Sequence, residues 1–168
     1  MSEKNSKGHL AALYCRAMLA MADTKWGRPI GYPNAHVRAY NEGQYTVTET
    51  RYFDERASWF FGTIVISRNN ETLWVMQYQG HSTDEDAAAF LRQVLADTWK
   101  KNTFLGGRGP RAARDSTVPG TETFDYANHL DVDSTEQRFR GTVHVRERGG
   151  DGRDLIYCEY SGGLVKLL

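Results

Sequence analysis

The stretch FFGTIVISRNNETLWVMQYQG, residues 60–80, has a close counterpart in FRGTVHVRERGGDGRDLIYCEYSGG, residues 139–163. In both stretches, two runs rich in β-branched and aromatic residues flank a short polar segment, a pattern typical of a β-hairpin. In the first stretch that segment holds Asn69 and Asn70, and asparagine tolerates the positive φ of a tight turn. The sequence therefore predicts two similar hairpins, the second of which ends the chain.

The similarity extends beyond the hairpins. Apolar residues recur at helical spacing over residues 10–21 and again over residues 87–95, which predicts one amphipathic helix before each hairpin. Ser82 and Glu85 are expected to form the capping box of the second helix. Helix, opening strand and closing strand all correspond, as the pairs Leu13 and Phe90, Gly62 and Gly141, and Tyr78 and Tyr160 illustrate.

Residues 44–53 and 121–132 supply one more predicted strand before each hairpin. We therefore predict an α+β fold in a single domain, residues 1–168. Two pseudo-symmetric helix–strand–strand–strand repeats, about residues 9–80 and 82–168, would form a mainly antiparallel sheet with the helices packed on it. The seam between two such repeats is a common place for a ligand pocket.

Composition disfavours several classes of function and location. The chain has 168 residues, and its 21 basic and 21 acidic side chains cancel, which disfavours nucleic acid as a partner. No apolar run approaches the ~20 residues that cross a membrane, so no membrane association is expected. The polar start MSEKNSKGHL does not lead into a signal-peptide pattern, which favours a cytoplasmic location. Cys15 and Cys158 are isolated and read as reduced thiols.

Several short motifs resemble an uncharacterised bacterial domain family. They are Y-x-E-G-x-Y at 40–45, L-W-V-M-Q-Y-x-G at 73–80, R-G-P at 108–110 and I-Y-x-E-Y-x-G-G at 156–163, with F-x-G before each closing strand. Members of that family occur alone or fused behind a helix-turn-helix head, so the resemblance implies a regulatory role in a bacterium or phage. Thr63, Thr142 and Gln77 depart from the family pattern, which expects an acidic residue after F-x-G and Asn in place of Gln77.

Gln77 and Glu159 take equivalent places in the two hairpins. Strand alternation places Trp74 and Tyr78 on one face and Gln77 on the other, and large side chains on both faces predict that both are covered. Under that expectation Glu159 would line the seam and orient a ligand, or act there as an acid–base group with Tyr157 or Tyr160. The alternatives are that Gln77 and Glu159 are exposed to solvent at a sheet edge, or that a nearby arginine pairs with Glu159.

The segment FLGGRGPRAAR, residues 104–114, combines backbone freedom with cations. Its glycines allow N–H groups to turn toward an anion, and the forked donors of Arg108, Arg111 and Arg114 suit carboxylate or phosphate. It lacks the Gly-Lys-Ser/Thr of a phosphate-binding P-loop. The alternative is a solvated linker whose arginines pair with surface acids.

Other chemistry finds little support in the sequence. The acidic and histidine-containing runs at 80–86 and 125–133 fit no calcium or zinc pattern, so no metal site and no cofactor is expected. No Gly-x-Ser-x-Gly elbow is present, and no catalytic residue is assigned. The tryptophans and tyrosines, Trp26, Tyr32, Trp59 and Trp99 among them, suit either a core or contact with a flat ligand.

We therefore predict a small-molecule binding module, sensing or sequestering an anionic or nucleotide-like ligand at the seam. The alternatives are a protein-interaction inhibitor or immunity-type protein, a homodimer, and a small acid–base enzyme using Glu159. The residues expected to touch the ligand are Trp74, Gln77, Tyr78, Arg108, Arg111, Tyr157, Glu159 and Tyr160.

Overall fold

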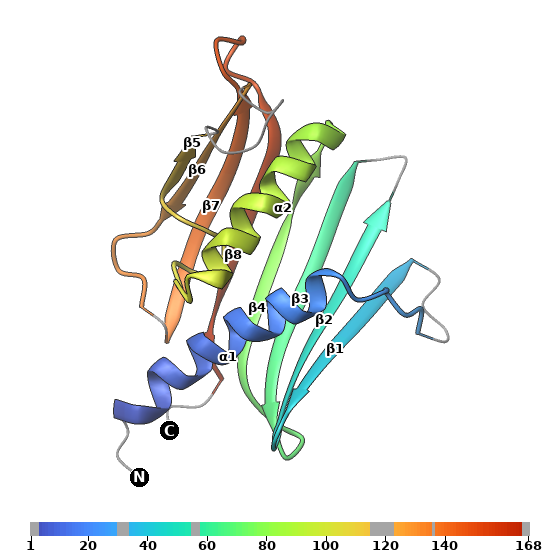
Figure 1. Ribbon diagram of the computed structural model, residues 1–168, viewed down its shortest axis with the longest axis vertical. Helices are drawn as coiled ribbons and strands as arrows, with labels where there is room; N and C mark the ends of the chain where they lie inside the picture. The colour runs from blue at the N-terminus through green and yellow to red at the C-terminus, as the bar shows by residue number, and fades with distance from the viewer. Residues whose placement is uncertain (1–3, 30–33, 55–57, 115–122, 136, 166–168) are drawn as a thin grey trace.

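The computed structural model describes residues 4–29, 34–54, 58–114, 123–135 and 137–165. One helix and four strands follow one another twice along the chain (Figure 1). The elements are α1 (Lys4–Ala22), β1 (Ala35–Glu42), β2 (Tyr45–Asp54), β3 (Trp59–Arg68), β4 (Glu71–Ser82), α2 (Glu85–Lys100), β5 (Ala112–Arg114), β6 (Phe124–Leu130), β7 (Arg138–Glu147) and β8 (Asp154–Leu164).

All eight strands join one antiparallel sheet in the order β1-β2-β3-β4-β8-β7-β6-β5. Each set of four strands forms a meander, and the two meanders meet where β4 pairs with β8. In that central pair Tyr78 lies directly opposite Tyr160. The predicted combination of two helices and an antiparallel sheet is therefore confirmed.

The prediction of three strands per half is wrong, because each half has four. The missed strands are β1 and β5, which form the two edges of the sheet. β1 has the sequence AHVRAYNE, whose inward positions include Arg38 and Tyr40 rather than an apolar series, and β5 has only three residues. Neither gives the alternating pattern on which strand prediction depends.

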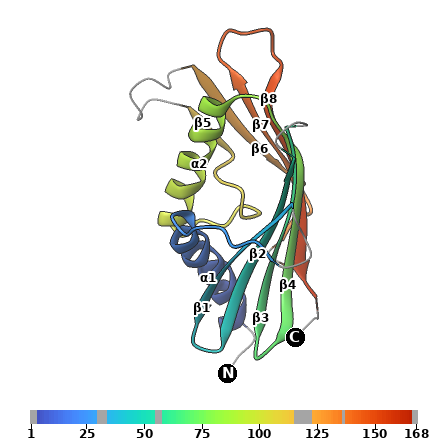
Figure 2. The ribbon, with the colours of Figure 1, turned by 90° about the vertical axis from the view of Figure 1, so that its right-hand side faces the viewer.

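Both helices lie on the same face of the sheet and leave the other face uncovered within the described part of the chain (Figure 2). The prediction that both faces are covered is thus wrong. On the helix-covered inner face lie side chains such as Ile64, Met76 and Ile156, which are buried. On the outer face lie Gln77 and Glu159, which are exposed.

The predicted β3–β4 turn is confirmed, whereas the N-cap predicted for α2 is wrong. Asn69 and Asn70 have φ of 50° and 67° in the β3–β4 turn, as predicted. The N-cap of α2 is Asp84 rather than Ser82, because the Asp84 carboxylate accepts a hydrogen bond from the backbone N–H of Ala87 at 2.7 Å. An aspartate at this position also suits the helix dipole.

Two glycines make room for the central tyrosines. Gly62 on β3 lies beside Tyr78, and a Cβ at Gly62 would come within 2.1 Å of Cζ of that ring. Gly141 on β7 lies beside Tyr160, where a Cβ would come within 2.5 Å of the hydroxyl. Each ring therefore lies flat across its neighbouring strand. Its hydroxyl reaches the strand beyond, at Glu49 for Tyr78 and at Asn128 for Tyr160.

The core fills the space between the helices and the sheet. Leu13, Tyr14 and Met21 from α1 pack there with residues from both halves of the sheet. Cys15 and Cys158 are buried free thiols. Neither α1 nor α2 has the length and apolar character that a membrane-crossing helix needs.

Candidate functional site: an arginine-lined pocket between helices and sheet

A pocket of about 240 Å³ opens between the two helices and the inner face of the sheet. It draws on both halves of the chain, since α1, β1, β2, β3 and β4 contribute on one side and α2, β8 and the segment after α2 on the other. The lining residues are Met18, Ala22, Trp26, Arg38, Glu49, Arg51, Phe60, Tyr78, Ser82, Ala88, Leu91, Arg92, Leu95, Trp99, Arg108 and Ile156. Four arginines and one glutamate give this lining a clear excess of positive charge.

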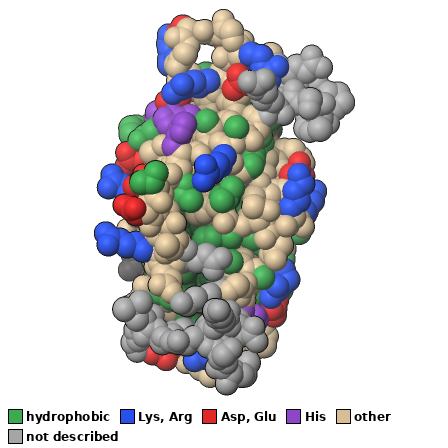
Figure 3. Space-filling view, turned by 90° about the vertical axis from the view of Figure 1, so that its left-hand side faces the viewer, with side chains coloured by type: hydrophobic (Ala, Val, Ile, Leu, Met, Phe, Trp, Pro, Cys, Tyr) green, Lys and Arg blue, Asp and Glu red, His purple; other side chains and the backbone are tan. Residues whose placement is uncertain are grey.

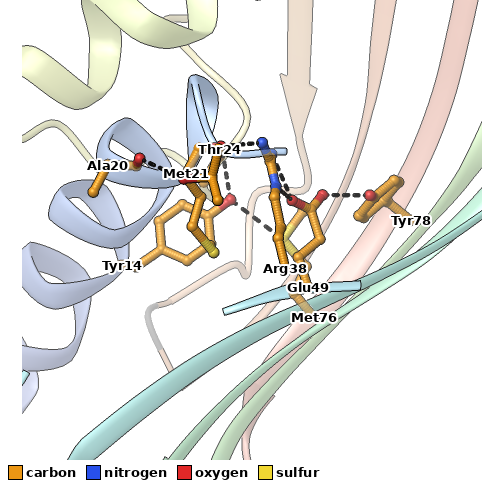
Figure 4. Close-up of polar contacts among 9 residues, drawn as sticks. Tyr14, Ala20, Met21, Thr24, Arg38, Glu49, Met76 and Tyr78 are labelled. Atoms are coloured by element: carbon orange, nitrogen blue, oxygen red, sulfur yellow. Dashed lines mark hydrogen bonds and ion pairs between the residues drawn. The ribbon is translucent and has the colours of Figure 1, made fainter. Parts of the chain in front are cut away.

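One of these arginines is fully partnered. Arg38 pairs with Glu49 on the neighbouring strand, with 2.7 Å between Arg38 Nε and Glu49 Oε2, and it also donates to the carbonyl of Met21 at the end of α1 (Figure 4). Tyr78 donates to the other oxygen of Glu49 at 2.5 Å. Trp26 covers the Arg38 guanidinium, whose Cζ lies 4.4 Å from the ring centroid. The Glu49 charge is therefore neutralised within the pocket wall.

Burial and the Glu49 charge both raise the pKa of Tyr78 well above its ordinary value. The phenol therefore stays protonated at neutral pH and keeps donating to Glu49. Tyr78 adds no negative charge to the pocket, so the charge of the remaining arginines is not offset from that side.

Arg51 and Arg108 differ from Arg38. The Nε atom of each is buried, and neither has a hydrogen-bond partner among the described residues. Arg108 Nη2 lies 3.7 Å from the thiol of Cys158, whose pKa is raised by burial, so the nearest acceptor is uncharged. A buried donor without a partner costs free energy, and a cation costs more than a neutral group.

Both arginines line the same pocket. The Arg108 guanidinium lies 4.0 Å above the Tyr78 ring. Arg51 is opposite Gly62, the residue over which that same ring lies, and its Cζ is 5.3 Å from the centroid of Phe60. Both charges act on Tyr78 and on Cys158. An anion in the pocket would therefore be attracted by both guanidinium groups.

The segment after α2 brings Arg108 to this place. It enters the space between the helices and the sheet, where it is drawn in yellow (Figure 2). Gly106, Gly107 and Gly109 have φ of 64°, 72° and 100°, which residues with a side chain rarely adopt. A Cβ at Gly107 would come within 2.8 Å of the Tyr14 ring. These glycines let the backbone pass between buried tyrosines, so the segment is not the solvated linker that was the alternative interpretation.

Hydrogen bonds fix the same segment. Asn128 on β6 donates to the carbonyls of Leu105 and Gly109, each at 3.2 Å. Tyr14 donates to the carbonyl of Gly107 at 3.1 Å, and Tyr126 donates to that of Arg108. The backbone position of Arg108 is thus held from both sides.

The eight residues predicted to bind ligand do not form one site. Tyr78 and Arg108 meet in the pocket. Trp74 lies in the hydrophobic core, stacked on Phe139 with 5.6 Å between ring centroids. Tyr160 is buried and donates to Asn128 at 2.5 Å. Arg111 is exposed at the end of the segment, and only the backbone of Arg114 is described.

Gln77, Tyr157 and Glu159 lie on the outer face. Gln77 and Glu159 border a shallow groove of about 540 Å³ there, with Gln79, Arg140 and Thr142. The hydrogen bond from Tyr157 lowers the pKa of Glu159 and raises that of Tyr157 to about 12. These shifts move the two pKa values away from neutrality, which does not suit a general acid or base working near pH 7.

The outer face also carries a row of aromatic rings across five strands. Trp59, His81, Tyr157, His144 and His129 follow one another with centroids 5.6, 6.0, 5.2 and 5.4 Å apart. Viewed from the β5 edge, acidic and basic side chains alternate without a large patch of one sign (Figure 3). Within the described residues, no three His, Cys, Asp or Glu side chains come together in a position to hold a metal ion.

Sequence reasoning missed Glu49, Arg51 and Arg38, the charged centre of the pocket. A signal was available in the strand YTVTETRYFD, where Val47, Glu49 and Arg51 share the inward face. Charged residues on the face that carries a buried valine indicate a buried polar site. Arg38 gave no comparable signal, because its strand was not predicted. Tyr32 lies outside the described residues.

Comparison of the chain with protein-family models, with curated proteins and with solved structures finds no match in any of the three.

Proposed function

We propose that this protein is a small-molecule binding module whose ligand is an anion held in the pocket between the helices and the sheet. The observation that carries the proposal is that Arg51 and Arg108 line one pocket and that the buried Nε atom of each has no hydrogen-bond partner among the described residues. Two guanidinium groups in a largely apolar lining would favour the binding of an anion there.

We further propose that the two halves are pseudo-symmetric repeats and that the pocket belongs to their seam. Several correspondences support this. Gly62 relates to Tyr78 as Gly141 relates to Tyr160, and the two tyrosines face each other where the meanders meet. Glu49 and Asn128 take matching places as acceptors of the two tyrosine hydroxyls. Superposition of the two halves in an experimental structure by a twofold rotation passing between Tyr78 and Tyr160 would test this relation.

Binding without catalysis is the role that these side chains favour. The pocket contains no nucleophile next to a base, since Glu49 is occupied by Arg38 and Tyr78. The regulatory role implied by the resemblance to the helix-turn-helix-associated family is consistent with sensing or sequestering, and it stays a prediction, as does a cytoplasmic location.

Mass spectrometry of the purified protein, first native and then denatured, tests the proposal. We expect an acidic compound at one per chain in the wild type, and its loss in Arg51→Met and Arg108→Met. If the wild type is free of ligand, thermal shift assays against a library of acidic metabolites follow. Equal shifts for wild type and both variants throughout that library would contradict the proposed site.

A second candidate function is protein interaction through the outer face. Tyr52, Trp59 and Phe61 are 38%, 57% and 39% exposed and gather at one end of that face, which gives an apolar patch on an otherwise polar surface. A homodimer or a heterologous partner would both use such a patch. Light scattering after size-exclusion chromatography, on wild type and Trp59→Ser, tests for the homodimer. An equal mass for both proteins, that of one chain, would rule it out.

A further inference from the structure

The dimensions and walls of the pocket restrict the ligand class, given the proposed function on which this step rests. We infer that the ligand is a compact planar carboxylic acid, with one carboxylate bridging Arg51 and Arg108 and an apolar ring system lying against the helices. Size, wall chemistry and the geometry of the donors each point to this class.

Size is the first restriction. A volume of about 240 Å³ equals that of about eight water molecules and lies below the range of roughly 300–1,000 Å³ that is usual for drug-sized ligands. A one-ring or two-ring acid fits within it. A nucleotide would have to place its base or its sugar and phosphates outside the pocket.

The walls favour an apolar body. Apart from the charged residues around Tyr78, most of the lining is aromatic or aliphatic, and the α2 side presents only Arg92 as a charged group, on its exposed surface. Flat rings gain contact area from such walls at little cost in conformational entropy. The apolar lining residues are Met18, Ala22, Trp26, Phe60, Ala88, Leu91, Leu95, Trp99 and Ile156.

The donors favour a carboxylate. The guanidinium groups of Arg51 and Arg108 are planar, and both side chains line the pocket. A carboxylate has two oxygens and can accept from both arginines in one plane. The pocket wall already holds one carboxylate through two donors, because Glu49 accepts from Arg38 on one oxygen and from Tyr78 on the other.

The charge of the pocket also favours a monocarboxylate over a polyphosphate. With Arg38 neutralised by Glu49, the interior carries the two charges of Arg51 and Arg108. A polyphosphate would bring more negative charge than these two groups balance, and it would lie near the Glu49 carboxylate. A monocarboxylate leaves a small positive excess and brings less negative charge near Glu49.

Isothermal titration calorimetry with matched probes tests the inference. The probes are benzoate, naphthalene-2-carboxylate and cyclohexanecarboxylate, the primary amide of each, 2-naphthyl phosphate and adenosine monophosphate. We expect at least one acid to bind at least tenfold more tightly than its amide and more tightly than either phosphate. Arg51→Lys keeps the charge but loses the planar fork, so binding of that acid should weaken at least tenfold. The control is Arg153→Met, an exposed arginine in the β7–β8 turn, which should leave binding unchanged.

The outcomes separate the two proposals. If either phosphate binds more tightly than every acid, the inference that the ligand is a carboxylic acid is overturned. The anion-binding function still stands in that case, provided that Arg51→Lys weakens binding of the phosphate. Equal binding of acid and amide would overturn the bridging role of the two arginines. Absence of binding by all probes would overturn the inference, and if the acidic-metabolite library also failed to distinguish wild type from Arg51→Met, the proposed function would fail with it.

Discussion

Arg38 and Arg51 project from neighbouring strands into one pocket, and they differ in whether a carboxylate meets them. Arg38 has Glu49, whereas the Nε of Arg51 has no partner among the described residues. A buried ion pair that loses one partner leaves an uncompensated charge, while a buried donor without a hydrogen bond, such as Arg51 Nε, costs free energy in the intact protein. The same substitution should therefore have opposite effects at the two positions.

We expect Arg51→Met to raise the free energy of unfolding of the ligand-free protein by about 1 kcal/mol, because an unpaired donor and charge are removed. Arg38→Met should lower it by about 3 kcal/mol, because Glu49 stays buried without its cation. Urea unfolding followed by tryptophan fluorescence measures both. Two losses of similar size would show that Arg51 is satisfied in the free protein and would remove the main support for the ligand site.

The glycine beside Tyr78 allows a second prediction. Gly62→Ala places a methyl group where the ring now lies, so the ring must move and its hydrogen bond to Glu49 must break. We expect a loss of about 2–4 kcal/mol in unfolding free energy. Gly8→Ala, in α1 with nothing within 4 Å of the added atom, is the matched control and should be neutral or slightly stabilising. Equal stability of the two variants would argue against the close approach of Tyr78.

The sequence predicted some individual residues and not others. Gly62 and Gly141 were recognisable because each lies in a hairpin strand where a glycine is otherwise unfavourable. Trp74, Gln77 and Glu159 were assigned to one site although strand alternation places Trp74 and Gln77 on opposite faces, because the helix-covered face could not be identified. Which face of a strand is open depends on where distant helices pack, and a single strand carries no record of that.

The segment between α2 and β5 acts as a structural element although it is neither helix nor strand. Its position depends on side chains from other elements, above all on Asn128, which donates to two of its carbonyls and accepts from Tyr160. The positive φ values at three of its glycines show how much its course departs from ordinary backbone. Arg108 is therefore positioned by hydrogen bonds to its own carbonyl and to the carbonyls of Leu105, Gly107 and Gly109.

Asn128→Leu should test this dependence. The substitution leaves the hydroxyl of Tyr160 and the carbonyls of Leu105 and Gly109 without their partner, so we expect a loss of about 2–4 kcal/mol in stability. Ligand affinity should fall as well, because Arg108 loses its fixed position. Tyr160→Phe is the control: it removes one of the three bonds, should cost about 1 kcal/mol, and should leave affinity nearly unchanged. Unaltered affinity in Asn128→Leu would show that the segment holds its course without β6.

Elements with a strong local pattern were predicted well, namely both helices and the strands of the two hairpins. The β3–β4 turn was predicted down to its two asparagines. The edge strands β1 and β5 were missed because a strand paired on one side only can be short or polar. The shape of the segment from Phe104 to Pro110 could not be predicted, since tertiary contacts rather than its own residues choose its path.

At the scale of the molecule, the two meanders are joined through one central pair of strands, β4 and β8. Separating the meanders would expose the paired edges of both strands. These two strands contact each other along nine residue pairs, from Trp74 and Leu164 to Ser82 and Ile156. Folding of either half alone would leave an unpaired central edge and an uncovered apolar face. The stability of each half therefore depends on the other.

Native-state hydrogen exchange should reflect this arrangement. We expect the amides that join β4 and β8 to exchange only by global unfolding, and those of the edge strand β5 to exchange by local opening at much lower free energy. The measurement is exchange by mass spectrometry or NMR across a series of low urea concentrations. Faster exchange in β4–β8 than in β1–β2 would show that the halves separate before they unfold.

The segment that carries Arg108 also occupies the space against β6 and β8, where its carbonyls meet Asn128 and its glycines meet Tyr126 and Tyr160. Under the proposed pseudo-twofold relation, this space corresponds to the part of the pocket that lies against β2 and β4. Under that relation, the segment's own backbone fills one of two equivalent spaces, and only the other is open to a ligand. Saturation should come at one molecule per polypeptide, without homotropic cooperativity inside a single copy.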